Sequence, residues 1–141
     1  MTLVEVVLGI TILSLICTIS FTKLNLDNYK TKSFIRQLAS DIRYVRKINK
    51  LGNSNVYIIF TSSEGKKGYI LRENGNNAKT IFLPKGIDIK YSVSNILFDR
   101  QGAFHTGGTT ISIGKNGDFT KITIVPVSGR VLIKEGIYDE T

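Results

Sequence analysis

The sequence has little of what disulfides, metal sites and most catalytic sites require. It holds one cysteine, Cys17, and one histidine, His105, among 141 residues. A single cysteine excludes an intramolecular disulfide, and one cysteine with one histidine cannot build a zinc site. The glycine-rich phosphate loop, the dinucleotide fingerprint and the nucleophile elbow are also absent. We therefore expect no metal, no cofactor and no enzyme activity, and interpret His105 as a surface residue; pairing with Asp99 or Asp118 is the alternative.

Charge is absent from Val6 to Thr22, and the only charged residue before this run is Glu5. At about 1.5 Å per residue, a helix of this length roughly crosses a bilayer core of about 30 Å. A signal-peptide core would follow a basic segment and end in small residues before a cleavage site, and this run has neither. The pattern predicts that residues 1–22 are the transmembrane part of an N-terminal helix.

Glycine and proline are absent from residues 10–51, so one long helix to about Leu51 is the simplest interpretation. Over residues 23–52 it becomes amphipathic, with apolar residues at spacings of three and four. Asn25–Asn28 is its weak point, because these side chains compete for backbone hydrogen bonds. Gly52-Asn53 predicts its end. Docking onto a sheet is favoured over a coiled coil for the apolar stripe, which comprises Phe34, Ile35, Leu38, Ile42, Val45 and Ile48.

From Asn55 onward the composition is typical of strands, so residues 53–141 are expected to form a globular β-rich domain. Turn-forming pairs such as Asn74-Gly75 and Asn116-Gly117 separate the apolar runs and indicate hairpins. Residues 109–133 read as a three-stranded antiparallel meander, and Pro126 is expected at an edge or bulge. The predicted strands are 56–60, 69–71, 80–83, 87–93, 96–98, 109–113, 119–125 and 130–133.

The expected fold class is therefore α+β, with one long N-terminal helix packed on antiparallel β-sheets. With 141 residues in all, the chain has room for one modest globular domain beyond the apolar run. The formal net charge of +8 favours anionic partners such as nucleic acid, lipid headgroups or an acidic protein face. Because the lysines are scattered, a solvated surface accounts for most of this charge.

Glu5 stands at the start of the apolar run. A carboxylate in a spanning helix costs about 2.5–3.5 kcal/mol on insertion scales, so it usually has a partner or a function. The alternative is a helix-end position, where Glu5 reaches headgroup water and favours the positive end of the helix dipole. Thr2-Leu3-Val4-Glu5 with the following apolar run resembles the mature N-terminus of type IV pilins and pseudopilins, whose pattern is Phe-Thr-Leu-x-Glu. Met1 departs from the usual Phe.

The C-terminal half carries a second resemblance. Ile96–Gly102, Thr110–Ile113, Lys121–Ile124 and Ser128–Val131 follow one another in the order typical of the GspH/FimT minor pilin and pseudopilin domain. In that family a strand ends in Phe and a turn Gly, two further strands follow, and the last hairpin contains Gly-Arg. The resemblance implies a pilin-like lollipop, whose long helix lies half in the membrane and half on the β-sheets.

The family implies a function as well as a fold. A minor pilin or pseudopilin assembles into a type IV pilus-like or secretion pseudopilus filament. Met1 would be the residue exposed and N-methylated by a prepilin peptidase, after removal of a basic leader. Thr2, Leu3 and Glu5 would serve in assembly, with Glu5 attracting the α-amine of residue 1 on a neighbouring subunit.

The partners implied are other pilin or pseudopilin subunits, the prepilin peptidase, an inner-membrane assembly platform and membrane lipid. The chain would cross the cytoplasmic membrane once, with its C-terminal domain outside the cytoplasm, and enter an extracellular or periplasmic filament. Lys23, Lys30 and Lys32 follow the apolar run, and the positive-inside rule applied to them alone favours the opposite orientation. A basic leader would have to outweigh them.

Two other functions remain open. One is a DNA-binding competence pilin, with Lys115, Lys121, Arg130 and Lys134 as candidate phosphate contacts. DNA-binding FimT-type pilins carry a Gly-Arg-x-Arg run, whereas this chain has Gly129-Arg130-Val131-Leu132 and lacks the second Arg. We expect weak DNA binding at most. The other is a membrane-tethered β domain that binds a surface partner without polymerising, although a mere tether has no use for Glu5.

Overall fold

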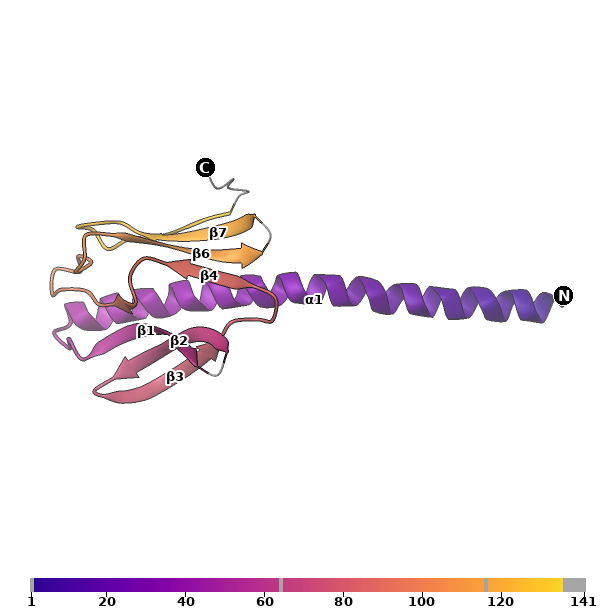
Figure 1. Cartoon of the computed structure of the whole chain (residues 1–141), viewed down its shortest axis with the longest axis horizontal. Coiled ribbons are helices and arrows are strands. Elements are labelled where there is room, and N and C mark those ends of the chain that lie inside the picture. Colours follow the sequence, from indigo (N-terminus) through magenta and orange to yellow (C-terminus); the bar gives the residue numbers. More distant parts are fainter. Residues whose placement is uncertain (1, 64, 116, 136–141) are drawn as a thin grey trace.

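The computed structural model describes residues 2–63, 65–115 and 117–135, which form one long helix and eight strands (Figure 1). The side chains of residues 19–25 and 63 lie outside this description. The helix runs between two antiparallel sheets over its C-terminal half and projects from them over its N-terminal half. The predicted α+β class, with a long helix packed on antiparallel sheets, is confirmed.

Helix α1 spans Leu3–Lys50 without interruption, as the absence of glycine and proline from residues 10–51 predicted. Its 48 residues make it about 72 Å long. The helix continues through Asn25–Asn28, the segment expected to be its weak point. Helix formation is cooperative, and two long flanking segments outweigh the low propensity of a few polar residues.

The helix ends where Gly52-Asn53 predicted. Gly52 has a φ of 99°, its N–H donates to Asn49 O at 2.9 Å, and the Asn53 N–H donates to Ile48 O at 3.3 Å. These two hydrogen bonds form a Schellman motif, which satisfies carbonyl groups that the helix would leave unpaired. The left-handed φ explains why glycine occupies position 52.

The eight strands divide into two four-stranded sheets. Sheet A has the order β3-β2-β1-β5 and sheet B the order β4-β6-β7-β8, and all recorded pairs are antiparallel. The strands are β1 (Val56–Ser63), β2 (Lys66–Glu73), β3 (Asn76–Phe82), β4 (Asp88–Tyr91), β5 (Asn95–Ile96), β6 (Thr109–Lys115), β7 (Asp118–Ile124) and β8 (Val131–Lys134).

The predicted strands all exist, with adjusted ends. The meander 109–133 is found as β6-β7-β8, and Asn74-Gly75 forms the tight β2–β3 turn with both residues at positive φ. The run 96–98 is shorter than predicted: Phe98 forms only an isolated bridge with Phe104. Pro126 lies two residues beyond the last residue of β7, in the β7–β8 turn, so it is outside the ladder and β7 needs no edge or bulge there.

The hydrophobic core lies between α1 and the inner faces of both sheets. The predicted helix stripe is buried from Phe34 to Val45, and Ile48 is partly buried against it. Ala39 is also fully buried, which widens the stripe enough to face two sheets rather than one. The sheets contribute alternate residues, as a period of two requires: Ile58, Phe60, Tyr69 and Leu71 from sheet A, and Ile111, Ile113, Ile122 and Ile124 from sheet B.

Candidate functional site

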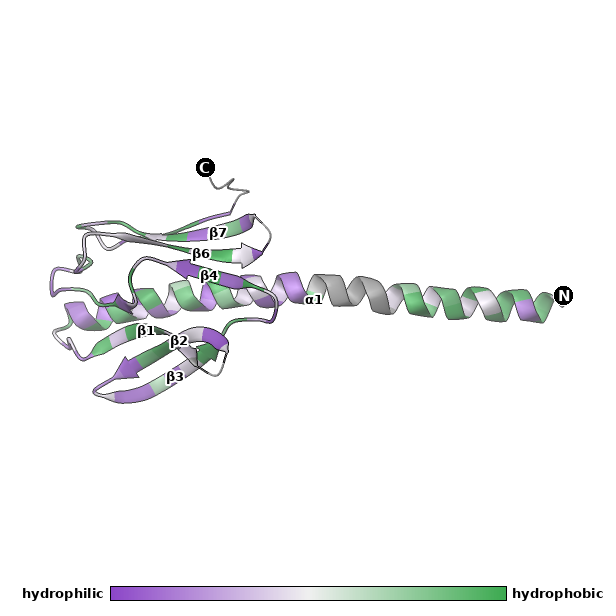
Figure 2. Ribbon diagram, viewed as in Figure 1, coloured by the Kyte–Doolittle hydropathy of each residue, from purple (hydrophilic) through white to green (hydrophobic). Residues whose placement is uncertain are grey.

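The N-terminal half of α1 forms the first candidate site. Over the described residues 2–18 every side chain is exposed, and ten large apolar ones lie between Leu3, 83 % exposed, and Ile16. Figure 2 shows this projecting stretch as mostly hydrophobic, with no part of the β domain beside it. A surface of this kind is typical of a segment that is covered in its functional state.

Glu5 lies at the start of this apolar surface and caps its own helix. Its Oε2 accepts a hydrogen bond from the backbone N–H of Thr2 at 2.8 Å, and Thr2 is the N-cap residue. A carboxylate in the first helical turn is also favoured by the helix dipole. The position therefore matches the helix-end interpretation of Glu5. Carboxylates have about four acceptor sites on two oxygens, so this bond leaves room for a second donor.

Leu3 and Thr2 are exposed beside Glu5, whereas Met1, the predicted processing residue, lies outside the described residues. In the part of the chain that the structure describes, no helix meets the length and apolarity expected of a membrane span. The predicted span 1–22 ends in residues 19–22, whose side chains are among those not described.

The predicted phosphate contacts form the second candidate site, and the structure brings only two of them together. Lys121 on β7 lies directly opposite Lys134 on β8, and Ser112 on β6 is the other neighbour of Lys121. Directly opposite residues in an antiparallel ladder share one face. Lys90 on β4 extends this row, since it pairs with Ser112. The row Lys90-Ser112-Lys121-Lys134 lines a shallow groove of about 610 Å³ on the outer face of sheet B.

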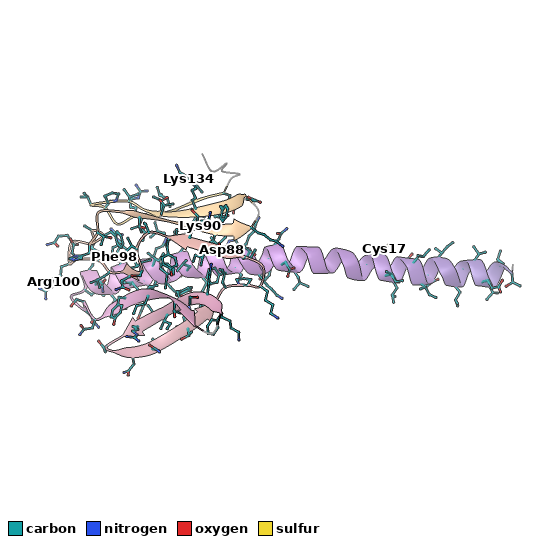
Figure 3. All side chains as sticks on the ribbon, in the orientation of Figure 1. Cys17, Asp88, Lys90, Phe98, Arg100 and Lys134 are labelled. Carbon is teal, nitrogen blue, oxygen red and sulfur yellow. The ribbon has the colours of Figure 1, made fainter. Side chains whose placement is uncertain are left out.

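The other two predicted contacts lie at opposite ends of sheet B. Arg130 is in the β7–β8 turn, four residues from Lys134, or about 13 Å along an extended chain. Lys115 pairs with Asp118 at the β6–β7 turn, about 10 Å from Lys121 along β7. Figure 3 shows Lys90 and Lys134 on the side of sheet B, while Arg100 lies at the far tip of the domain. Sequence spacing missed Lys90 because its strand is distant in the chain.

Two of the four C-terminal segments that carry the family resemblance, Ile96–Gly102 and Ser128–Val131, meet at the C-terminal end of α1. Arg46 Nε donates to Gly102 O at 3.0 Å and its Nη2 donates to Ser128 O at 2.6 Å. Gly129 has a φ of 58°, and a Cβ there would collide with the Gly102 carbonyl oxygen. Gly129 thus permits the close approach of the two loops, which Arg46 holds together, and Gly102 leaves room for the Lys50 and Arg46 side chains of α1. This cluster stabilises the domain tip and has no reactive geometry.

A second polar cluster is buried between α1 and sheet A. Asp41 accepts hydrogen bonds from Tyr69 Oη at 2.7 Å, from Lys79 Nζ at 2.9 Å and from Gln37 Nε2 at 3.0 Å. Burial, followed by the hydrogen bond to the Asp41 carboxylate, raises the pKa of Tyr69 far above its usual range. The Asp41 carboxylate thus joins α1 to Tyr69 on β2 and to Lys79 on β3, so the cluster anchors sheet A to α1.

The described residues bring together neither a metal-binding cluster nor the considered partners of His105. No group of three or more metal-binding side chains occurs there. His105 is exposed, and Asp99, its considered partner, accepts a hydrogen bond from the Ala103 N–H at 2.7 Å. Asp118, the other candidate, lies at the opposite end of sheet B in the β6–β7 hairpin. Cys17 is exposed on the projecting half of α1 (Figure 3).

A long helix with its C-terminal half packed on antiparallel sheets defines a type IV pilin-like fold. Two crystal structures of the type IV minor pilin FimU from Pseudomonas aeruginosa strain PAO1 share it. The first has a TM-score of 0.56 and 17 % identity over 76 % of this chain and 90 % of that one; the second has 0.54 and 17 % over 73 % and 91 %. No protein-family model matches the chain, and no curated protein shows significant sequence similarity. The resemblance to pilins is thus confirmed at the level of the fold.

Proposed function

We propose that this chain is a minor pilin-like subunit that assembles with other pilin subunits into a type IV pilus-like or secretion pseudopilus filament. One observation carries the proposal: the N-terminal half of α1 exposes ten large apolar side chains that do not touch the β domain, although the same helix continues into that domain. Lipid would cover this surface before assembly, and neighbouring helices would cover it in the filament. The role requires no catalysis.

Glu5 supplies the register of assembly in this proposal. The α-amine of residue 1 on a neighbouring subunit would donate to the Glu5 carboxylate, which already accepts the Thr2 N–H. Inside a bundle of apolar helices the attraction between such charges is strong, although it must exceed the desolvation of both groups. Capping of its own helix holds the carboxylate at a defined place, so little side-chain freedom is lost on pairing.

Processing and location follow from the same proposal. A prepilin peptidase would generate and methylate the amine of Met1, and an inner-membrane platform would extract the subunit from the membrane. The C-terminal domain would lie outside the cytoplasm throughout. The projecting half of α1 would serve first as membrane anchor and then as the packing surface inside the filament.

The test is to replace Glu5 by Gln and by Ala in the full chain. Gln keeps the size and the hydrogen-bonding capacity of Glu but lacks the attraction to an amine. We expect both variants to reach parental membrane levels, because the β domain does not contact Glu5, and to be depleted at least several-fold from crosslinks with neighbouring pilins. Asp27→Asn is the matched control, since Asp27 is exposed on the same helix; it should assemble normally.

The result separates two interpretations of Glu5. Equal crosslinking of the parent, Glu5→Gln and Glu5→Ala would contradict the charge pair and leave Glu5 as a helix cap. A cap alone contributes about 0.5–2 kcal/mol to a helix end, and its loss would change local helicity rather than assembly. Far-UV circular dichroism of the variants at equal concentration measures that difference.

A second candidate, DNA binding, rests on the row of Lys90, Lys121 and Lys134 on the outer face of sheet B. Lys121 and Lys134 lie directly opposite each other on one face, close enough together to contact the same phosphate. The hydroxyl groups of Thr110, Ser112 and Thr123 line the same groove and can donate to phosphate oxygens. We expect weak, salt-sensitive and sequence-independent binding.

A further inference from the structure

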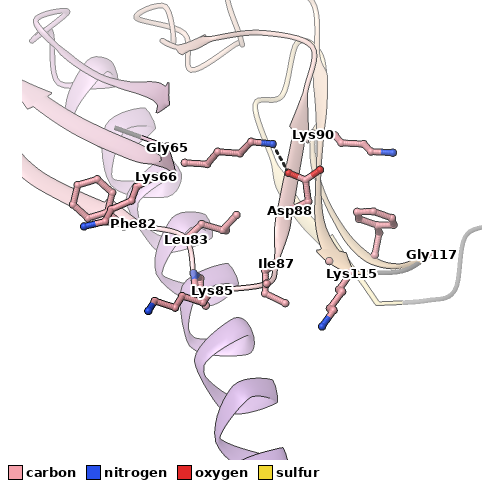
Figure 4. Close-up of a pocket in the computed structure, with 15 residues that line it drawn as sticks. Gly65, Lys66, Phe82, Leu83, Lys85, Ile87, Asp88, Lys90, Lys115 and Gly117 are labelled. Carbon is pink, nitrogen blue, oxygen red and sulfur yellow. Dashed lines mark hydrogen bonds and ion pairs between the residues drawn. The ribbon is translucent and has the colours of Figure 1, made fainter. Parts of the chain in front are cut away.

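A second basic surface lies at the end of the β domain from which the projecting half of α1 emerges. Three connections meet there: the β1–β2 turn, the β3–β4 segment and the β6–β7 turn (Figures 1 and 4). They enclose a cleft of about 1060 Å³. We call its lysines the basal lysine cluster; they are Lys66, Lys67, Lys85, Lys90 and Lys115.

The cleft is strongly positive. Among the described residues, its lining carries five lysines and one acidic residue, Asp88, a net of +4. Asp88 accepts a hydrogen bond from Lys67 Nζ at 2.6 Å, which is the main reason that its pKa lies below the usual value. That pair cancels one positive and one negative charge, and the four other lysines of the cluster, Lys66, Lys85, Lys90 and Lys115, carry the remaining +4 around the cleft (Figure 4).

Aromatic rings accompany the lysines. Phe82 is 50 % exposed, and Lys66 Nζ lies 5.8 Å from the centre of its ring. Lys90 Nζ lies 5.1 Å from the centre of the Phe119 ring. Lysine stems and aromatic rings present apolar carbon beside positive charge, a combination suited to the boundary between headgroups and acyl chains.

The cleft lies at the end of the domain that would face the membrane, and this position indicates its partner. Phe34 is the first buried residue among the described helix side chains, and it lies twelve positions after Thr22, or about 18 Å along the axis. With headgroup layers about 5–7 Å thick, the base of the domain stands roughly one Debye length above them. A helix tilt of about 20°, which is average for spanning helices, would bring one side of the base to within about a Debye length of the headgroups.

We propose that the basal lysine cluster binds the phosphate groups of anionic phospholipids in the membrane that holds α1. This inference rests on the proposed membrane-anchored function. Anionic lipid attracts juxtamembrane lysines over about a Debye length, so it tilts the subunit and docks its base on the surface. Such docking holds the domain in one orientation before it enters a filament.

The absence of tryptophan from the sequence permits a direct test. Phe82→Trp places a fluorescent donor at the base of the domain. Leu51→Trp, at a residue 75 % exposed at the opposite end of the domain, is the control donor. Each full chain is reconstituted in vesicles of neutral phosphatidylcholine, or of phosphatidylcholine with phosphatidylglycerol, that carry a dansyl acceptor on lipid headgroups. Both leaflets have the same composition, so the direction of insertion does not affect the result.

We expect energy transfer from the basal tryptophan to be greater in anionic vesicles than in neutral ones, and transfer from position 51 not to increase. Most of the excess should disappear at about 1 M salt, where the Debye length is about 3 Å. The triple variant Lys66→Gln, Lys85→Gln, Lys115→Gln should abolish it. The charge-matched control Lys47→Gln, Arg100→Gln, Arg130→Gln, at exposed positions remote from the base, should preserve it.

The possible failures are distinguishable. Equal transfer from the basal tryptophan in neutral and anionic vesicles overturns the lipid inference and leaves membrane anchoring intact; this is the outcome if the cluster instead binds an acidic face of a neighbouring protein. A chain that does not associate with neutral vesicles overturns the proposed anchoring, and the lipid inference with it. Loss of the excess in the control triple variant shows that net charge alone is responsible and also overturns the inference.

Discussion

Asn49, near the end of α1, accepts a hydrogen bond through Oδ1 from the backbone N–H of Phe98 at 3.0 Å. Its Nδ2 donates to Asn53 O at 2.8 Å and to Val56 O at 2.9 Å. Asn49 is 2 % exposed, so one buried amide joins the helix end, the start of β1 and the segment after β5. This polar residue within an apolar stripe explains how three chain segments satisfy their backbone groups in the core.

Asn49→Ala should therefore be strongly destabilising. It leaves the Phe98 N–H and the Val56 carbonyl buried without this partner, and we expect a loss of about 2–4 kcal/mol in the free energy of unfolding. The measurement is urea unfolding of the full chain in mild detergent, followed by tyrosine fluorescence, with the midpoint falling and the m-value unchanged. Ser40→Ala, an exposed polar-to-alanine change on the same helix, should stay within about 0.5 kcal/mol. A loss no larger than that of Ser40→Ala would contradict the role assigned to Asn49.

Tyr69 should make the domain sensitive to alkaline pH. Its folded-state pKa is raised above the model-compound value of 10.0, so above pH 10 the folded chain retains a proton that the unfolded chain loses. The stabilisation is complete below about pH 10 and is lost as the pH rises, by up to about 1.4 kcal/mol per pH unit.

Tyr69→Phe tests this dependence. At neutral pH the variant should lose about 1–2 kcal/mol, because Asp41 keeps Lys79 and Gln37 as partners. Above pH 10 its stability should fall less steeply than that of the parent. Tyr29→Phe, at an exposed position on α1, should leave the slope unchanged. Parallel slopes for the parent and Tyr69→Phe between pH 9 and about pH 11 would be inconsistent with the raised pKa.

The row of lysines on the outer face of sheet B leads to a prediction of how charge substitutions change DNA binding. The double variant Lys121→Gln, Lys134→Gln removes two adjacent positive charges from one groove. The magnitude of the slope of log K against log salt should therefore fall by about 2 units. In the control Arg100→Gln, Arg130→Gln, an equal charge is removed at the domain tip, and a smaller change is expected. Fluorescence anisotropy with a labelled duplex at several salt concentrations measures both slopes. Equal slopes for the two double variants would show that no groove is involved, and tight binding at high salt would favour a receptor function.

Much of the fold follows from local patterns. Phe34, Leu38 and Ile42 recur at helical spacing, so burial of this face was predictable without knowing what covers it. Gly52 and Asn74-Gly75 fixed the helix end and a hairpin because positive φ is required there. The Thr2-Leu3 and Glu5 pattern likewise predicted the fold family through resemblance.

The rest depends on contacts between distant segments. Lys90 joins Lys121 only because β4 pairs with β6, a register that no local signal encodes. Asp41 and Asn49 read as ordinary polar helix residues, yet both are buried with complete sets of partners. The basal lysine cluster escaped prediction for the same reason, since its members come from β2, β4, β6 and the β3–β4 segment. Arg130 was grouped with Lys134 by proximity in sequence, although the extended chain separates them.

The order in which the chain visits its two sheets has a mechanical consequence. It passes from sheet A to sheet B after β3, returns after β4 and crosses again after β5. Both layers also share the same helix as their core. A pull on the projecting half of α1 is therefore borne by both layers at once, in shear along the helix axis. Neither layer can separate from the helix while the three crossings hold, so the domain should resist such a pull as a single body.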